Sequence, residues 1–468
     1  MNANDFSGKS QARLSIALYA APLSALICSS ASWLHYWLTG SVRLREFPRE
    51  PVLAWTGLMA AAGLVLLGAC CVTAFLSINR QNARKILYSA LAVHAIMLTA
   101  LPLFSTDLFS YLAYGQLAAR GLNPHAVGPA ALGQSPLLGM VGWVNTPSVY
   151  GPIADLLMSV AGHVGQWADS PVWIAGLCYK SIVGLFDITS LLIMYAVLGA
   201  SDERYLLRGF ALFALCPVLA WEVAGQAHND GLVVCAAAVY VWASRRGKDS
   251  LGVVALALGA LSKFVLAPTL ALQLRVFART GILRVVPYAA LILAVAVVSY
   301  LPTWSGLATL NSWIQPMSHD DTFRQGTSLY TVLWKVLRVL HAPESAHAVS
   351  YLTYVWTGRL LVATLGASFL WRVRNSEDVA FASLIVLLAL LSTSTSSAAW
   401  YLPWTLPFVA VQRETRWQVF ILGLTVVCAP AHGPAPLWLL LPIGQVAGLV
   451  ALCKWSVPKV FAAGPPTS

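Results

Sequence analysis

Apolar runs of about 20 residues, long enough to cross the hydrocarbon core of a bilayer as an α-helix, recur from one end of the chain to the other. Short polar or basic stretches separate them. The runs predict spanning segments near residues 14–38, 52–77, 86–104, 171–199, 209–226, 229–244, 250–262, 264–275, 285–303, 349–371, 379–395, 402–412, 417–430 and 436–453. We therefore expect an all-α membrane protein, a polytopic helical bundle of about 11–14 transmembrane helices.

Several of these runs are too short to cross a bilayer alone. The pair that meets at Ser262–Lys263 and the run 402–412 are typical of tilted or broken helices. Backbone can break at membrane depth only where protein or a water-filled cavity covers it. The short runs therefore predict a cavity on the outer side of the bundle.

Composition supports one membrane domain over residues 1–468. Hydrophobic residues make up 58% and charged residues 10% of the chain, whereas soluble domains carry roughly 25% charged residues. The net charge of +11 fits basic cytoplasmic loops, and we expect no nucleic-acid partner. The eight cysteines lie in apolar segments without metal-ligand spacing, so no disulfide framework is expected.

Basic residues also predict the orientation. Clusters such as Arg80–Lys85, Arg204–Arg208, Arg245–Lys248 and Arg413–Arg416 all fall on one side, which we assign to the cytoplasm. Both termini then lie inside, as expected for a multi-pass protein of the bacterial inner membrane. Only the basic residues of 43–49 disobey the rule.

This orientation leaves two long outer loops, 105–170 and 304–348. The first contains the apolar piece Ile153–Trp167, which we interpret as a surface helix because a crossing there would invert every later basic loop. The second contains His319-Asp320-Asp321, which is either a divalent-metal site or a solvated loop. Residues 462–468 are predicted to be a disordered tail.

Asp107 is the first candidate for chemistry. It follows the apolar run that ends at Phe104 and lies at the predicted mouth of a span, with Tyr111, Tyr114 and Asn123 after it. A single acid at the membrane–water boundary indicates chemistry at the interface.

A second polar group lies in G-Q-A-H-N-D, residues 225–230. Glu222, Gln226 and Asp230 are spaced to share one face of a continuous helix, and His228 and Asn229 accompany them. Burying an ionisable residue in a membrane costs roughly 2.5–3.5 kcal/mol or more, so such residues mark functional sites by default. The alternative is helix capping by Asn229 or Asp230.

Cations within spans need anionic or polar partners. The partner of Lys263 is either a carboxylate such as Glu222 or a ligand phosphate. Arg359 has a ligand or a structural role, since arginine suits phosphate. Lys180 and Asp187 lie two helical turns apart, too far to pair, and are interpreted as parts of a structural network.

Aromatic and turn residues complete the candidates. Trp400-Tyr401 forms either an interfacial aromatic belt or a wall for a sugar or polyprenyl chain. Tyr150-Gly151-Pro152 indicates a sharp turn that would fix the outer loop above the cavity.

Six segments in order carry a family resemblance. T-D-L-F-S-Y-L-A-Y-G, G-L-N-P-H, T-P-S-V-Y-G-P-I, G-Q-A-H-N-D-G, L-S-K-F-V-L-A-P and W-Y-L-P-W extend over about Thr106 to Pro403. Together they resemble the polyprenol-phosphate-mannose-dependent mannosyltransferases, in the bacterial α-mannosyltransferase branch. His125 stands where the family usually has Asn-Pro-Tyr.

The resemblance implies a GT-C fold and an inverting transfer. A polyprenyl-phosphate sugar, with mannose expected, would be the donor, and a lipid or glycan would be the acceptor. Asp107 would be the general base, and Lys263, with Arg359 or Arg324, would neutralise the departing phosphate. No cofactor or metal is expected. The substrate-binding candidates are Tyr111, Asn123, Tyr150, Glu222, His228, Asn229, Asp230, Trp400 and Tyr401.

Two other functions remain open. Midplane charges and broken spans also suit a secondary transporter or flippase for a lipid-linked or sugar substrate, although transporters often contain internal repeats and none is visible here. A different GT-C member that transfers arabinose or aminoarabinose, or that acts on protein, is the third possibility.

Overall fold

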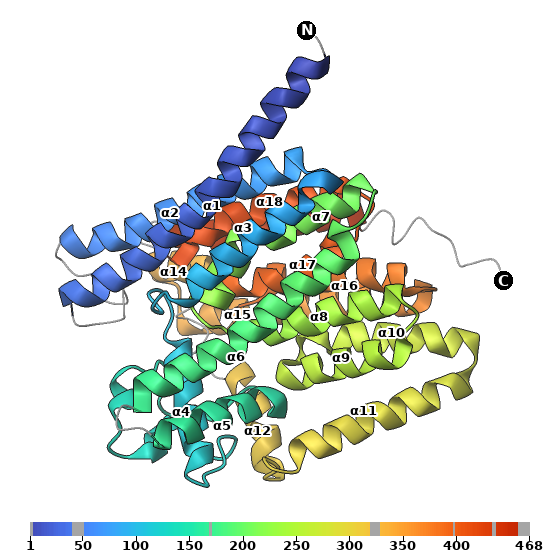
Figure 1. The fold of residues 1–468 in the computed structure, drawn as a ribbon. Coiled ribbons are helices and arrows are strands. Elements are labelled where there is room, and N and C mark those ends of the chain that lie inside the picture. Colours follow the sequence, from blue (N-terminus) through green and yellow to red (C-terminus); the bar gives the residue numbers. More distant parts are fainter. Residues whose placement is uncertain are drawn as a thin grey trace.

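The computed structural model describes residues 3–39, 51–167, 171–318, 328–395, 398–432 and 437–456. Within these ranges all regular structure is helical and no strand occurs (Figure 1). The all-α class predicted from the apolar runs is therefore confirmed.

Five described helical segments are long and apolar enough to cross a membrane: Gln11–Thr39, Trp55–Ser77, Val172–Gly199, Ile282–Tyr300 and Ser376–Thr393. A sixth arises if Arg204–Ala214 and Leu219–Gly225, bent by 43°, form one span. The bend lies at Pro217, which lacks the N–H that would continue the helix. The total of about 11–14 spans stays a prediction, because shorter apolar helices such as Asp249–Ser262 cross only when tilted or in series.

The N-terminal part is a packed trio of helices. Helix α1 (Ala3–Thr39) and α2 (Pro51–Ser77) form a hairpin, and α3 (Arg80–Leu98) packs against α1. Helix α6 (Pro171–Met194, continuing as a π-helix to Gly199) packs against α3. Helices α1, α2 and α3 lie in the upper half of Figure 1, and α6 runs from the lower left towards the centre of the view.

The central helices are the most buried. Helix α7 (Arg204–Ala214), a π-helix (Leu219–Gly225), α8 (Asp230–Arg245) and α16 (Ser376–Thr393) supply much of the core. By contrast, α11 (Val285–Tyr300) has no buried residue and lies at the lower edge of Figure 1. This helix packs against α9 on one side, and the exposed apolar residues on its other sides fit contact with lipid.

The remaining helices surround this core. They are α9 (Asp249–Ser262), α10 (Ala267–Thr280), α12 (Leu307–Ser318), α14 (Leu329–Val339), α15 (Glu344–Arg372), α17 (Leu406–Ala410), α18 (Thr415–Cys428) and α19 (Leu440–Ala451).

Both breaks expected from short runs are present. Helix α9 ends at Ser262, Lys263 is extended (φ −154°), and a short 3-10 helix leads into α10. Before α17 the chain forms a 3-10 helix, Ala399–Thr405. Proline at 268 and at 403 removes a backbone donor near each break.

Helices α4 (Asp107–Ala119) and α5 (Pro152–Gln166) lie together at the lower left of Figure 1. A helix therefore forms where the sequence predicts Ile153–Trp167. The two helices approach very closely at Gly115 and Gly162, since a Cβ on Gly115 would lie 2.0 Å from the Met158 carbonyl oxygen. We call the end of the bundle that carries α4 and α5 the Asp107 end.

Buried polar contacts fix the elements beneath the Asp107 end. Lys180 Nζ donates to the carbonyl oxygens of Ala100 (2.7 Å) and Gly225 (2.5 Å), which joins the chain after α3 to the end of the π-helix. The Asp187 carboxylate contacts His94 Nδ1 at 2.5 Å. Lys180 and Asp187 thus have separate partners, which confirms the predicted structural network.

Candidate active site

Asp107 begins α4, directly after the chain leaves α3. Its backbone N–H donates to Ser105 Oγ (3.1 Å), and its side chain is 17% exposed. An acid in the first turn of a helix is stabilised as a carboxylate by the helix dipole. The Asp107 side chain is therefore partly exposed, whereas the side chains around it are buried.

A strained turn brings His228 to Asp107. The π-helix ends at Gly225, Ala227 adopts φ +59°, and α8 begins at Asp230. A positive φ is uncommon for alanine, and strain of this kind clusters at functional sites. The spacing alone suggested that residues 222, 226 and 230 share one face of a continuous helix. That prediction is wrong, because the chain turns between the π-helix and α8.

The imidazole of His228 lies between two carboxylates. Its Nε2 is 3.6 Å from Asp107 Oδ2 and 3.0 Å from Ser105 Oγ. Its Nδ1 is 3.2 Å from Glu222 Oε2 and 3.1 Å from the Glu222 carbonyl oxygen. The ring stacks on Trp400 with centroids 4.2 Å apart. Trp400 is thus part of the cluster and not only of an interfacial belt.

Capping does not account for residues 229 and 230. Asn229 is the N-cap of α8, but its side chain makes no capping hydrogen bond. Among the described residues, both amide atoms of Asn229, Asp230 Oδ2 and Gln226 Nε2 are buried without a hydrogen-bond partner. Buried polar atoms are normally satisfied, so such a group calls for a water or a ligand.

Lys263 is the cation of the site, and its partner is Asp230. Lys263 Nζ lies 2.8 Å from Asp230 Oδ1, an oxygen that also accepts from Trp404 Nε1 (2.5 Å). The sequence left open a carboxylate such as Glu222 or a ligand phosphate; the carboxylate in contact is Asp230, and Glu222 lies beside His228 instead. The rings of Tyr401 and Trp404 lie 4.8 and 5.1 Å from the ammonium, within cation–π range.

Tyr150 connects the two charged groups. Its ring lies 6.0 Å from Lys263 Nζ and 5.4 Å from the ring of Tyr111, which packs edge-on against it. Burial, and then the nearby Asp107 carboxylate, raise the pKa of the Tyr150 phenol well above its ordinary value. Tyr150 therefore remains neutral in the neighbourhood of both Asp107 and Lys263.

Gly151 docks the loop onto the break before Lys263. Its N–H donates to the Ser262 carbonyl oxygen (3.0 Å). A Cβ at this position would lie 1.9 Å from the Leu261 carbonyl oxygen, so no larger residue fits without movement. This contact fixes Tyr150 above the ammonium.

Asn123 and His125 fasten the loop at a distance from these charges. Asn123 Nδ2 donates to the carbonyl oxygen of Thr303 (2.7 Å), and its Oδ1 accepts from the His125 N–H (2.8 Å). His125 Nε2 lies 2.9 Å from Asp155 Oδ2. Burial lowers the pKa of His125, but the Asp155 carboxylate outweighs it and raises this pKa above its ordinary value. Sequence reasoning missed Asp155, since nothing in the pattern of α5 distinguishes it.

Of the two predicted arginines, the described one, Arg359, is not brought into the cluster. Arg359 is exposed on α15, where its guanidinium lies 5.2 Å from the Trp356 ring. Arg324 lies outside the described residues, as does His319-Asp320-Asp321. In the described ranges no group of three or more His, Cys, Asp or Glu side chains is arranged to hold a metal ion.

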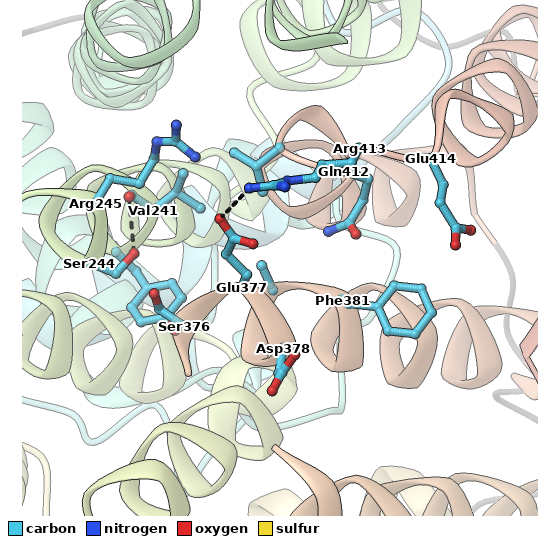
Figure 2. A pocket seen from close by; sticks show the side chains of 13 residues that line it. Val241, Ser244, Arg245, Ser376, Glu377, Asp378, Phe381, Gln412, Arg413 and Glu414 are labelled. Carbon is cyan, nitrogen blue, oxygen red and sulfur yellow. Dashed lines mark hydrogen bonds and ion pairs between the residues drawn. The ribbon is translucent and has the colours of Figure 1, made fainter. Parts of the chain in front are cut away.

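A separate pocket of about 280 Å³ lies at the other end of α8 (Figure 2). Its walls are the last turn of α8, the first turns of α16 and the segment after α17, and Arg245, Glu377, Arg413 and Glu414 line it. Because α8 has 16 residues, Arg245 lies about 22 Å from Asp230 by helix rise. This pocket is therefore distinct from the Asp107 cluster.

Comparison with known proteins identifies a family. The family described as "Alpha-(1->6)-mannopyranosyltransferase, N-terminal domain" matches residues 18–279, which include Asp107, the 222–230 group and Lys263. No curated protein and no solved structure matches the chain. Because the match covers more than half of the 468 residues, the chain belongs to this mannosyltransferase family and is a multi-pass membrane glycosyltransferase.

Proposed function

We propose that the chain transfers mannose from a polyprenyl-phosphate donor to a hydroxyl of a lipid or glycan acceptor, with Asp107 as general base. One observation carries the proposal: Asp107 and Lys263 are both partly exposed and both lie near Tyr150, in surroundings that are otherwise buried. The family description makes an α-(1→6) linkage the first one to test.

The chemistry is a single displacement. The acceptor oxygen attacks the anomeric carbon while its proton passes to Asp107, and the bond from that carbon to the phosphate oxygen breaks. A positioned general base typically contributes about 10²–10⁴-fold. Attack opposite the leaving group inverts the anomeric centre, so a β-linked donor gives an α-linked product.

Lys263 supplies positive charge for the departing phosphate. An ammonium has three donors, and Asp230 accepts one of them. The side chain is 21% exposed, so the ammonium is open to a ligand. A cation fixed where negative charge develops stabilises the transition state, because it need not reorganise during the reaction.

The sugar would be recognised by the buried polar atoms beside these charges. Asn229, Gln226 Nε2 and Asp230 Oδ2 have the donors and acceptors that sugar hydroxyls need. Trp400 and Tyr401, whose rings pack edge-on at 5.8 Å, would provide an apolar wall. Tyr111 would support Tyr150 from below.

The orientation in the membrane is inferred from the basic loops. We propose that the reaction takes place on the outer face of a bacterial plasma membrane, with both termini in the cytoplasm and a GT-C arrangement of helices. Arg359 and Arg324 remain candidates for the donor phosphate on the family resemblance alone.

A transporter or flippase is the second candidate, since the break at Lys263 and the 43° bend also suit alternating access. The two functions differ in what Asp107 does. A base is needed for transfer but not for movement of the lipid.

The test uses purified protein in lipid nanodiscs with radiolabelled polyprenyl-phosphate mannose and a panel of acceptors. Asp107→Asn should lower product formation by about 10²–10⁴-fold, whereas Asp202→Asn, which removes an exposed carboxylate paired with Arg80, should not. Transfer at the wild-type rate by a folded Asp107→Asn would overturn the proposal. Donor movement across liposomes without transfer would favour the flippase.

A further inference from the structure

The fully buried pair Glu222–His228 lies directly behind Asp107 and does not reach the open side of the cluster. The exposed fraction of the His228 side chain is 0% and that of Glu222 is 1%, against 17% for Asp107. The pair contacts Asp107 through His228 Nε2, so it can act on the reaction through that carboxylate.

The hydrogen bonds of His228 determine which nitrogen carries its proton. A backbone carbonyl oxygen can only accept, and that of Glu222 lies 3.1 Å from Nδ1, so Nδ1 is protonated. Nε2 therefore faces Ser105 and Asp107. When the imidazole gains a second proton, Nε2 presents positive charge 3.6 Å from Asp107 Oδ2.

Two features hold the ring in this position. The ring stacks on Trp400 with an angle of 29° between the planes, which fixes the directions of both nitrogens. Ser105 Oγ bridges the pair to the base, since it contacts Nε2 at 3.0 Å and accepts the Asp107 N–H at 3.1 Å.

A positive charge on His228 would also benefit the buried Glu222 carboxylate. A carboxylate buried without an opposite charge is very costly, and the cation-forming group at ion-pair distance from it is His228. When Glu222 is ionised, it therefore favours the imidazolium. The other titratable groups that face the cluster from neighbouring elements are Lys180, Asp230, Lys263, Tyr111, Tyr150 and Tyr179.

We propose that His228, charged and held by Glu222, is a positioning residue that keeps Asp107 ionised and aimed at the acceptor hydroxyl. The inference rests on the proposed transferase function. It assigns Glu222 and His228 to the support of the base, where the sequence had grouped them with substrate-binding residues.

The measurement is the pH profile of kcat/KM for mannosyl transfer. A base works only when deprotonated, so activity falls as the pH drops through the acid limb. A positive neighbour within about 4–6 Å favours the ionised carboxylate by about 1–3 pH units. Replacing His228 removes that charge, and the acid limb of His228→Asn should move to higher pH by about one unit. Glu222→Gln should move it in the same direction by less.

Two further variants keep the test sharp. Ser105→Ala removes the bridge without opening a large cavity; it should lower kcat and leave the donor KM unchanged. His163→Asn is the matched control, because His163 is exposed on α5 and bonds within its own helix, so its profile should equal the wild type. A folded His228→Asn with an unmoved acid limb would overturn this inference.

Failure of the inference and failure of the function are distinguishable. If the wild type transfers mannose and Asp107→Asn does not, the proposed function is supported, wherever the acid limb of the His228→Asn pH profile lies. If the wild type shows no transfer with any polyprenyl-phosphate sugar, the proposed function falls first.

Discussion

The two ends of α8 carry the same kinds of charged side chain in opposite settings. At the Asp107 end, Asp230 is fully buried and pairs with Lys263 at 2.8 Å. At the other end, Arg413 and Glu377 contact each other at 3.5 Å with 72% and 66% of their side chains exposed (Figure 2). Water screens the second pair much more than the first, so similar pairs of charges differ in how strongly they interact.

The difference explains why only one end is a candidate for chemistry. Buried charges need partners and respond strongly to a neighbouring charge, which is how active sites tune acids and bases. Exposed ion pairs contribute about 0–1 kcal/mol, and many contribute nothing measurable. The pocket at the far end contains charged side chains, but its Arg413–Glu377 pair is of this weaker kind.

Removing one carboxylate from each pair should separate the two ends most clearly. Asp230→Ala leaves the Lys263 ammonium unpaired in a largely buried site, and breaking a buried pair costs about 3–5 kcal/mol. Because Lys263 keeps some contact with water, we expect a loss near the lower end, about 3 kcal/mol. Glu377→Ala should cost less than about 1 kcal/mol. Unfolding of both variants in detergent provides the comparison, and equal losses would contradict it.

Removing one cation from each end tests function. Lys263→Met should raise the KM for the polyprenyl-phosphate donor by about 10–100-fold, since a charge-assisted hydrogen bond contributes about 1.5–3 kcal/mol. Arg413→Met, in the far pocket, should leave the donor KM unchanged. Donor titrations at fixed acceptor concentration measure both. A wild-type KM in Lys263→Met would remove its role at the phosphate.

The docking of the loop on the Asp107 end can be tested with glycines. Gly151→Ala would place Cβ 1.9 Å from a backbone oxygen, whereas at Gly139 nothing lies within 4 Å. Overpacking of this kind costs about 1–3 kcal/mol, and the shift should also move Tyr150 away from Lys263. We expect lower stability and lower kcat in Gly151→Ala and neither change in Gly139→Ala. Normal activity in both would show that the loop is more adaptable than this contact indicates.

The smallest effect concerns His125 and Asp155. The pKa of His125 is raised in the folded protein, so the pair stabilises the fold below the ordinary pKa of the histidine, and this stabilisation is lost as the pH rises through the folded pKa. The Tm of the wild type should therefore fall over that interval. Asp155→Asn should flatten the dependence, and an unchanged slope in that variant would exclude the pair as its cause.

Local signals predicted the breaks in the helices well. Proline near Lys263 and in W-Y-L-P-W acts on its own neighbourhood, because a missing N–H disrupts the same turn in any fold. The candidate residues Asp107, His228 and Lys263 also stood out, because a charge in an apolar run is conspicuous. Their partners did not: the sequence offered a carboxylate such as Glu222 or a ligand phosphate for Lys263, whereas Lys263 pairs with Asp230 and Glu222 lies beside His228.

The sequence by itself determined that this is a membrane protein and to which family it belongs. Mean hydropathy of +0.71 and repeated apolar runs require a membrane environment. The family match over residues 18–279 also comes from the sequence alone. Only the tertiary structure decided which charges meet, since Lys263 and Asp230 are 33 residues apart and His228 and Ser105 are 123 apart. The physical reason is that a charge finds its partner through the packing of helices, and that packing depends on the shapes of many side chains at once.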